Sequence, residues 1–253
     1  LAMSCYLRSL GAKVYEIPLT PFGMNLEVLE KYLHTGTISY IFVMPYLQNP
    51  TGICYSNEYL HKLVELAKAY DCYIIEDGTY CDFLLSRQYT PLFNLSSEGR
   101  VIYLYHFSKV YLPYMKYSFA CLPLQILKRF NDDIDCSFNE RFLRYYLDSA
   151  ALKKIRSQVL TVSQERYTYL LQKLAPLSPT ISYSNSWGGL SLWCKVPDMI
   201  FPSFYQKLQK KDVIIAPEEL FTYLPPNGHF RLSVSHLSLT QIDRLTKHLI
   251  ESI

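Results

Sequence analysis

Short apolar segments recur along the first half of the chain and define its predicted sheet. Five of them are rich in Val, Ile, Tyr and Phe and are almost continuously apolar, at residues 12–19, 40–45, 72–76, 101–107 and 117–122. Continuous apolar runs of this length are typical of strands that are buried on both faces of a sheet. The pattern therefore predicts an α/β fold with a mostly parallel sheet that is flanked by helices.

One helix of crossover length is predicted between the second and third of these strands. Residues 57–70 place apolar side chains along one helical face, and Ser56 is a candidate N-cap. A strand, this helix and the next strand form a βαβ unit, for which a right-handed connection is strongly preferred.

The second half of the chain begins with a long helical stretch. Ser137 and Glu140 form a candidate capping box at its start, it runs to about Leu174, and Pro176 closes it.

Apolar segments then follow at residues 187–197, 213–221 and 230–237, before a final helix over residues 239–253 that Thr240 begins. We therefore expect two domains. Residues 1–135 would form a partial large α/β domain, and residues 136–253 a long connecting helix with a small C-terminal α+β domain.

Composition and charge narrow the class of protein. The 253 residues are 49% apolar and 15% aromatic, which is enough to bury a large core. The net charge is +3 and the basic residues form no run, so the chain itself shows no nucleic-acid surface. Its seven cysteines form no CxxC pair, which argues against a disulfide framework or a metal site and favours a reducing cytoplasm. No apolar run approaches the roughly 20 residues of a membrane span.

Candidate chemistry lies where the predicted strands end. Asn49, Asp77 and Lys109 each follow such a strand, and ligands of open α/β sheets bind at the carboxyl ends of strands. A lysine amine attacks an aldehyde only when it is deprotonated, and a second cation such as Lys116 favours that form. The alternative is that Lys109 is an ordinary solvated loop lysine.

Asp77 ends the apolar run YIIED, and Tyr80 follows it three residues later. A carboxylate at the tip of a buried strand is costly unless it meets a positive partner, and a protonated pyridine nitrogen is one such partner. A helix cap or a turn is the alternative for Asp77, and an ordinary turn asparagine is the alternative for Asn49.

Five motifs together carry a family resemblance. The segments QNPTG, IIEDGTY, FSK with a cation seven residues after the lysine, WGGLSLW and FRLSVS occur in this order over essentially the whole chain. The chain resembles the pyridoxal-phosphate-dependent aminotransferases of fold type I (class I/II). The resemblance implies that pyridoxal 5'-phosphate forms an internal aldimine with Lys109, that its pyridine nitrogen pairs with Asp77, and that Asn49 and Tyr80 bind its phenolic oxygen.

The resemblance also implies how the phosphate and the substrate are held. Ser108 and Lys116 would bind the phosphate, and Arg231, with Asn49, would bind the substrate carboxylate, because a guanidinium fork matches a carboxylate. An arginine on a strand surface is the alternative for Arg231. The family's pattern is altered at four positions near Lys109, namely His106, Tyr114, Lys116 and Ser118.

Family members carry roughly a hundred residues before the point that matches Leu1, including a helix end that binds the phosphate. We therefore expect the present chain to be a fragment that binds the cofactor weakly.

Three functions remain open at this stage. The first is an aminotransferase that acts on an amino acid and a 2-oxo acid, and the second is the effector-sensing domain of a MocR-type (GntR family) transcription regulator. In the second, DNA binding would need an upstream winged-helix domain. The third is a relic without catalysis. The resemblance further implies a homodimer.

Overall fold

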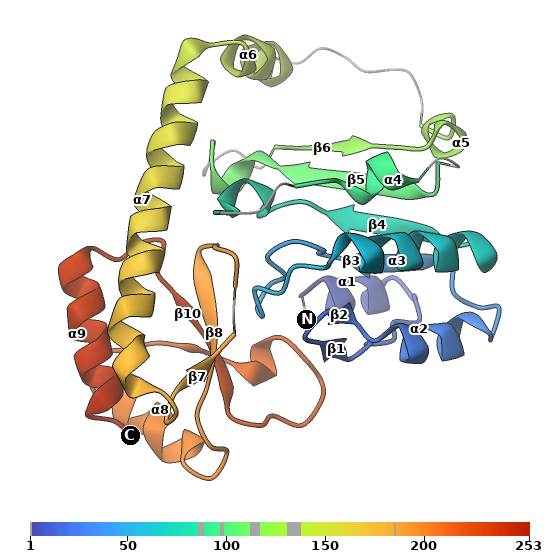
Figure 1. The fold of residues 1–253 in the computed structure, drawn as a ribbon. Coiled ribbons are helices and arrows are strands. Elements are labelled where there is room, and N and C mark those ends of the chain that lie inside the picture. Colours follow the sequence, from blue (N-terminus) through green and yellow to red (C-terminus); the bar gives the residue numbers. More distant parts are fainter. Residues whose placement is uncertain (1, 86–88, 97–98, 112–116, 131–137, 185) are drawn as a thin grey trace.

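The computed structural model describes residues 2–85, 89–96, 99–111, 117–130, 138–184 and 186–253. Figure 1 shows two sheets with their helices, and a long helix that runs from beside one to beside the other. Among the described residues, no helix is both long enough and apolar enough to cross a bilayer.

The first sheet contains four of the five predicted strands. Its strand order is β3-β4-β5-β6, and its members are β3 (Tyr40–Val43), β4 (Tyr73–Asp77), β5 (Val101–His106) and β6 (Ser118–Cys121). The first three strands are parallel and β6 is antiparallel to β5. This agrees with the predicted mostly parallel sheet.

The fifth predicted strand, over residues 12–19, is wrong. Residues 12–18 form no strand, and only Leu19–Thr20 (β1) pairs, with Gly23–Met24 (β2). The physical reason lies in the segment itself, because Lys13 and Glu16 interrupt its apolar side chains and Pro18 has no amide hydrogen for a ladder.

Helices α1 (Ala2–Ser9), α2 (Leu26–Leu33), α3 (Asn57–Ala69), α4 (Leu92–Leu95) and α5 (Leu124–Leu127) accompany this sheet. Helix α3 matches its prediction, since Ser56 accepts a hydrogen bond from the Tyr59 amide at 3.2 Å and its apolar face is buried. Together with β3 and β4 it forms the expected βαβ unit.

The long helical stretch is two helices rather than one. Helix α6 (Phe138–Leu147) ends before Ser149, whose side chain caps α7 (Ala150–Leu174) by accepting from the Leu152 amide at 3.4 Å. A serine hydroxyl that accepts a hydrogen bond from a backbone amide three residues later favours the start of a new helix at this point. The predicted end at Leu174 is correct, and Pro176 lies in the turn that follows.

The second sheet has the order β7-β8-β10-β9 and is antiparallel throughout. Its strands are β7 (Ser182–Tyr183), β8 (Ser191–Lys195), β9 (Ala216–Pro217) and β10 (His229–Ser233). Strands β8, β9 and β10 are shorter than the apolar segments that predicted them, and no segment predicted β7.

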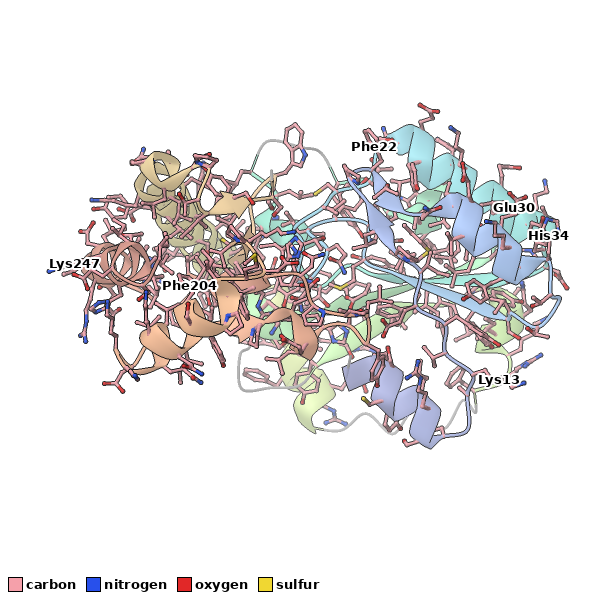
Figure 2. All side chains as sticks on the ribbon, turned by 90° about the horizontal axis from the view of Figure 1, so that it is seen from below. Lys13, Phe22, Glu30, His34, Phe204 and Lys247 are labelled. Carbon is pink, nitrogen blue, oxygen red and sulfur yellow. The ribbon has the colours of Figure 1, made fainter. Side chains whose placement is uncertain are left out.

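Helices α8 (Phe201–Gln209) and α9 (Leu239–Ile250) cover the second sheet together with α7, and the sequence pattern had not indicated α8. Figure 2 shows Phe204 of α8 inside this layer and Lys247 of α9 at its outer edge. The predicted start of α9 at Leu239 is correct, but the helix is capped by Ser238, in a capping box with Gln241, rather than begun by Thr240.

Two sequence predictions lie outside the described residues. The predicted domain boundary after residue 135 falls within residues 131–137, as does Ser137 of the predicted capping box. The boundary therefore stays a prediction.

Candidate active site

The loop after β3 holds Asn49 in a hydrogen-bonded turn. The Gln48 side-chain oxygen accepts from the Thr51 amide at 3.0 Å and from its hydroxyl at 2.6 Å. The Gly52 amide donates to the Gln48 carbonyl at 2.6 Å. Gly52 has a φ of +71°, and a Cβ there would lie 2.6 Å from the Ser186 hydroxyl, so the turn requires glycine. These bonds fix the backbone from which the Asn49 amide projects.

Asn49 meets Arg231, which lies 182 residues away on β10. The Arg231 Nη1 atom donates to the Asn49 Oδ1 atom at 2.7 Å. The Arg231 Nε atom is buried and has no hydrogen-bond partner among the described residues. A buried cationic N–H without an acceptor is costly, and a carboxylate oxygen would satisfy it.

Asp77 and Tyr80 lie at the end of β4, beside this arginine. The Asp77 Oδ1 atom accepts from the Thr79 amide at 2.9 Å and also from the Thr79 hydroxyl, which fixes the carboxylate. Burial raises the pKa of Tyr80, the charge of Arg231 lowers it, and that of Asp77 raises it further. The three side chains therefore share one electrostatic environment, in which Tyr80 keeps its proton and can donate it.

Lys109 lies in the turn Phe107–Lys109 that follows β5. Its Nζ atom is 5.9 Å from the centre of the Tyr80 ring, and the side chain is exposed. Ser108 is half-buried in the same turn, while Lys116 lies outside the described residues.

The structure thus brings together five of the seven candidate residues, at the carboxyl ends of β3, β4 and β5 and the facing side of β10: Asn49, Asp77, Tyr80, Lys109 and Arg231. Of the altered positions, His106 and Ser118 are directly paired across β5 and β6, and Tyr114 lies outside the described residues.

Gly188 of the WGGL segment makes a close contact between the two halves of the chain. Gly188 has a φ of +129°, and a Cβ there would lie 2.3 Å from the Phe83 carbonyl oxygen. The Leu85 amide donates to the Trp187 carbonyl at 2.9 Å. The backbone at Gly188 therefore lies directly against the segment that contains Phe83 and Leu85.

Two acids with hydrogen-bonded carboxylates, one buried and one half-buried, escaped the sequence analysis. Glu76 of β4 is fully buried, and its carboxylate accepts from the Tyr89 hydroxyl at 3.2 Å and from the Phe93 amide at 3.1 Å. Burial is the main cause that raises the pKa of Glu76 to about 7. An acid inside the apolar run YIIED was the available signal, since such a group needs partners.

Asp82 is the second acid. Its Oδ1 atom accepts from two nitrogens of Arg156 in α7, at 2.9 and 3.1 Å, and its Oδ2 atom accepts from the Tyr105 hydroxyl. A cavity of about 140 Å³ lies beside it and is lined by residues of the Cys81–Phe83 turn, of α7 and Gly189. The pair ties the turn after Tyr80 to the long helix.

Comparison with known proteins gives these residues a family context. The model of the family "Aminotransferase class I and II" matches residues 2–114. The aromatic-amino-acid aminotransferase 1 of Thermococcus litoralis is 28% identical, over 98% of this chain and 64% of that protein. The uncharacterized HTH-type transcriptional regulator YcxD of Bacillus subtilis is 24% identical, over 98% of this chain and 59% of that protein.

Solved structures agree with the sequence relatives. Pyrococcus horikoshii kynurenine aminotransferase superposes with a TM-score of 0.84 at 25% identity, over 94% of this chain and 63% of that one. The α-aminoadipate aminotransferase LysN of Thermus thermophilus, solved with N-(5'-phosphopyridoxyl)-L-leucine, has a TM-score of 0.82 at 22% identity, over 95% and 65%. The chain thus spans somewhat less than two thirds of the length of these proteins. Residues 2–114 are thus similar to the class I and II aminotransferases, and the chain has the fold type I architecture of the pyridoxal-phosphate-dependent aminotransferases that it superposes on.

Proposed function

We propose that the protein containing this chain is a pyridoxal-phosphate-dependent aminotransferase that moves an amino group between an amino acid and a 2-oxo acid. The observation that carries the proposal is the position of Tyr80. Its ring lies near the amine of Lys109, and its phenol senses the charges of Arg231 and Asp77. A lysine for an aldehyde, an acid for a pyridine nitrogen and an arginine for a carboxylate therefore surround one side chain.

The described residues fit pyridoxal 5'-phosphate. Asp77 would hold its pyridine nitrogen, Asn49 and Tyr80 would donate to its phenolic oxygen, and Lys109 would hold its aldehyde carbon. Ser108, with Lys116, would bind its phosphate. When bound, the cofactor supplies a ring that accepts electrons from the substrate Cα atom.

The protein's own groups would then bind and move protons. Arg231 orients the amino acid through its carboxylate, using the Nε atom that lacks a partner among the described residues. The Lys109 amine is exposed and lies on a turn. It would take the proton from the substrate Cα and then donate it to a neighbouring carbon of the reacting group. Asp77, whose carboxylate is held by the Thr79 amide, would hold the protonated pyridine nitrogen of the bound cofactor.

We further propose that the protein acts as a homodimer in the cytoplasm. The six described cysteines are all free, which suits a reducing compartment. Class I and II aminotransferases typically form dimers, and the similarity of this chain to that family supports the proposed homodimer.

A second candidate is an effector-sensing domain that binds an amino acid without turnover. Two Bacillus subtilis regulators, YcxD and YisV, match 98% and 93% of this chain at 24% and 22% identity. The altered positions His106, Lys116 and Ser118 near the lysine suit a sensor. In that case DNA would be bound only through a winged-helix domain upstream of the present residues.

The test is single-turnover half-transamination by the full-length protein loaded with pyridoxal phosphate. Amino acids are added one at a time, and the visible spectrum of the cofactor and the released 2-oxo acid are both recorded. Spectral change with stoichiometric 2-oxo acid supports the enzyme, and spectral change without it supports the sensor. If no amino acid changes the spectrum, and borohydride attaches no cofactor to Lys109, both functions are wrong.

A further inference from the structure

The guanidinium of Arg231 lies over an aromatic ring. Its Cζ atom is 5.0 Å from the centre of the Phe221 ring. Trp193, the cross-strand partner of Arg231, meets the Phe221 ring edge-on, with ring centres 5.6 Å apart at an angle of 90°. Trp193 also stacks on His229 at 5.4 Å and 6°. Three rings therefore form one continuous wall on the face of the second sheet that carries Arg231.

The loop that supplies Phe221 is held at both ends. On one side, Glu218 accepts at Oε2 from the Asn227 amide at 2.8 Å and from the His229 amide at 3.3 Å. On the other, Glu16 accepts at Oε2 from the Thr222 hydroxyl at 2.9 Å and from the Tyr223 amide at 3.2 Å. The Phe221 ring is thus fixed by contacts on either side of it in the chain.

These contacts constrain the arginine in two ways. Asn49 holds Nη1 at one edge of the guanidinium, and the Phe221 ring covers one of its faces. The edge that carries Nε keeps its hydrogen-bonding capacity, since Nε has no partner among the described residues. An arginine held in this way loses little side-chain entropy when a carboxylate binds, and a ring beneath a desolvated guanidinium adds a cation–π attraction.

We propose that Phe221 is a positioning residue for carboxylate recognition, which presents the Nε edge of Arg231 to the substrate without touching the substrate itself. This proposal rests on the proposed function only for the identity of the ligand. It differs from the role of Asn49, which engages the guanidinium by a hydrogen bond, because Phe221 acts through the face of its ring.

The experiment measures carboxylate binding in the absence of turnover. Full-length protein loaded with pyridoxal phosphate is titrated by calorimetry with 2-oxoglutarate and with phenylpyruvate, two 2-oxo acids that share the carboxylate and differ in side chain. Phe221→Leu removes the ring, Phe221→Tyr keeps it, and Arg231→Leu removes the clamp. Phe201→Leu is the matched control. It removes a ring that stacks on Tyr205 in α8, a helix that covers the same sheet, and not on Arg231.

We expect Phe221→Leu to weaken the binding of both 2-oxo acids by about three- to tenfold, the size of one cation–π contact. Phe221→Tyr and Phe201→Leu should bind both as the parent protein does, and the affinity for pyridoxal phosphate should be the same in all variants. A general loss of structure would not be repaired by tyrosine. If Phe221→Leu fails to fold, Phe221→Met replaces it, since methionine fills similar volume without an aromatic face.

Two results would overturn the proposal, and they separate it from the proposed function. If Arg231→Leu abolishes binding while Phe221→Leu binds normally, Phe221 has no positioning role and the function stands. If Arg231→Leu binds normally, Arg231 is not the clamp, and the assigned roles of both residues are wrong.

Discussion

The lysine side and the arginine side of the candidate site are built differently. Lys109 is exposed on a short turn, and its described contact is a distance of 5.9 Å to the Tyr80 ring. Arg231 is half-buried on a strand, with Asn49 at one edge and Phe221 across its face. A group that carries a proton between two atoms needs freedom to move, whereas a group that fixes a carboxylate gains from being held. The contrast suggests that chemistry and recognition are assigned to opposite halves of the chain.

The sharpest way to test this division is Lys109→Ala. We expect kcat to fall by on the order of a thousandfold or more, because the proton carrier is lost, while 2-oxo acid binding at Arg231 is retained. Steady-state kinetics and calorimetry measure the two effects on one preparation. The exposed Lys62, which forms an ion pair with Glu58 on α3, provides the control Lys62→Ala. Loss of carboxylate binding in Lys109→Ala would show that the two sides are not independent.

The first sheet, which lies on the lysine side, contains the buried acid Glu76, and Glu76→Gln tests what this acid contributes to stability. Glu76 is fully buried in the first sheet and its pKa is raised from 4.5 to about 7, mainly by burial. Between these two values the unfolded chain ionises this carboxyl while the folded protein keeps it protonated. Stability is therefore expected to fall as the pH rises from about 4.5 to 7, by on the order of 3 kcal/mol, and to change little from this group outside that range.

Glutamine cannot ionise, so Glu76→Gln should lose this component of the pH dependence and gain stability relative to the parent protein as the pH rises. Urea unfolding at several pH values between 4.5 and 8 measures it. Glu65→Gln on the exposed side of α3 serves as the control. Parallel curves for the parent and Glu76→Gln would contradict the raised pKa.

On the arginine side, the decisive substitution is Arg231→Lys. It keeps the charge but loses the planar fork, and we expect kcat/KM to fall by about ten- to a hundredfold, equivalent to about 1.4–3 kcal/mol of charged hydrogen bonding. The loss should appear mainly in KM. Arg244→Lys on α9, an exposed arginine near His248, is the matched control. An effect confined to kcat would place Arg231 in the chemistry rather than in recognition.

Local features of the fold were predictable, and long-range ones were not. Ser56 and the apolar face of α3 predicted that helix because cap and periodicity act within one segment. The apolar run at residues 12–19 predicted a strand wrongly. A strand also needs a neighbouring strand to pair with, and the charges and the proline of this run disfavour such pairing. The break at Ser149 was hidden because the apolar pattern continues on both sides of it.

The candidate site shows the same division. Asn49, Asp77 and Lys109 could be selected because each follows a recognisable strand end. The hydrogen bond between Asn49 and Arg231 could not, since nothing local encodes a contact across 182 residues. Phe221 and Asp82 were missed for the same reason, as their partners come from distant segments.

The smallest expected effect concerns the link between the two sides, through Asp82 and Arg156. Asp82 is 11% exposed and Arg156 is 48% exposed, so solvent weakens the pair, and Asp82→Asn should lower the free energy of unfolding by only about 1 kcal/mol. The control is Asp243→Asn on α9, which breaks an ion pair with Lys173 of α7. Lys173 is 40% exposed and Asp243 is 45% exposed, so this substitution should lower the free energy of unfolding less than Asp82→Asn does. The loss of kcat should be far smaller in Asp82→Asn than in Asp77→Ala, because Asp82 contacts α7 whereas Asp77 lies beside Tyr80. Equal losses of kcat in the two variants would mean that the turn after Tyr80 transmits the position of α7 directly to the reacting groups, and the two sides of the site would then act as one mechanical unit.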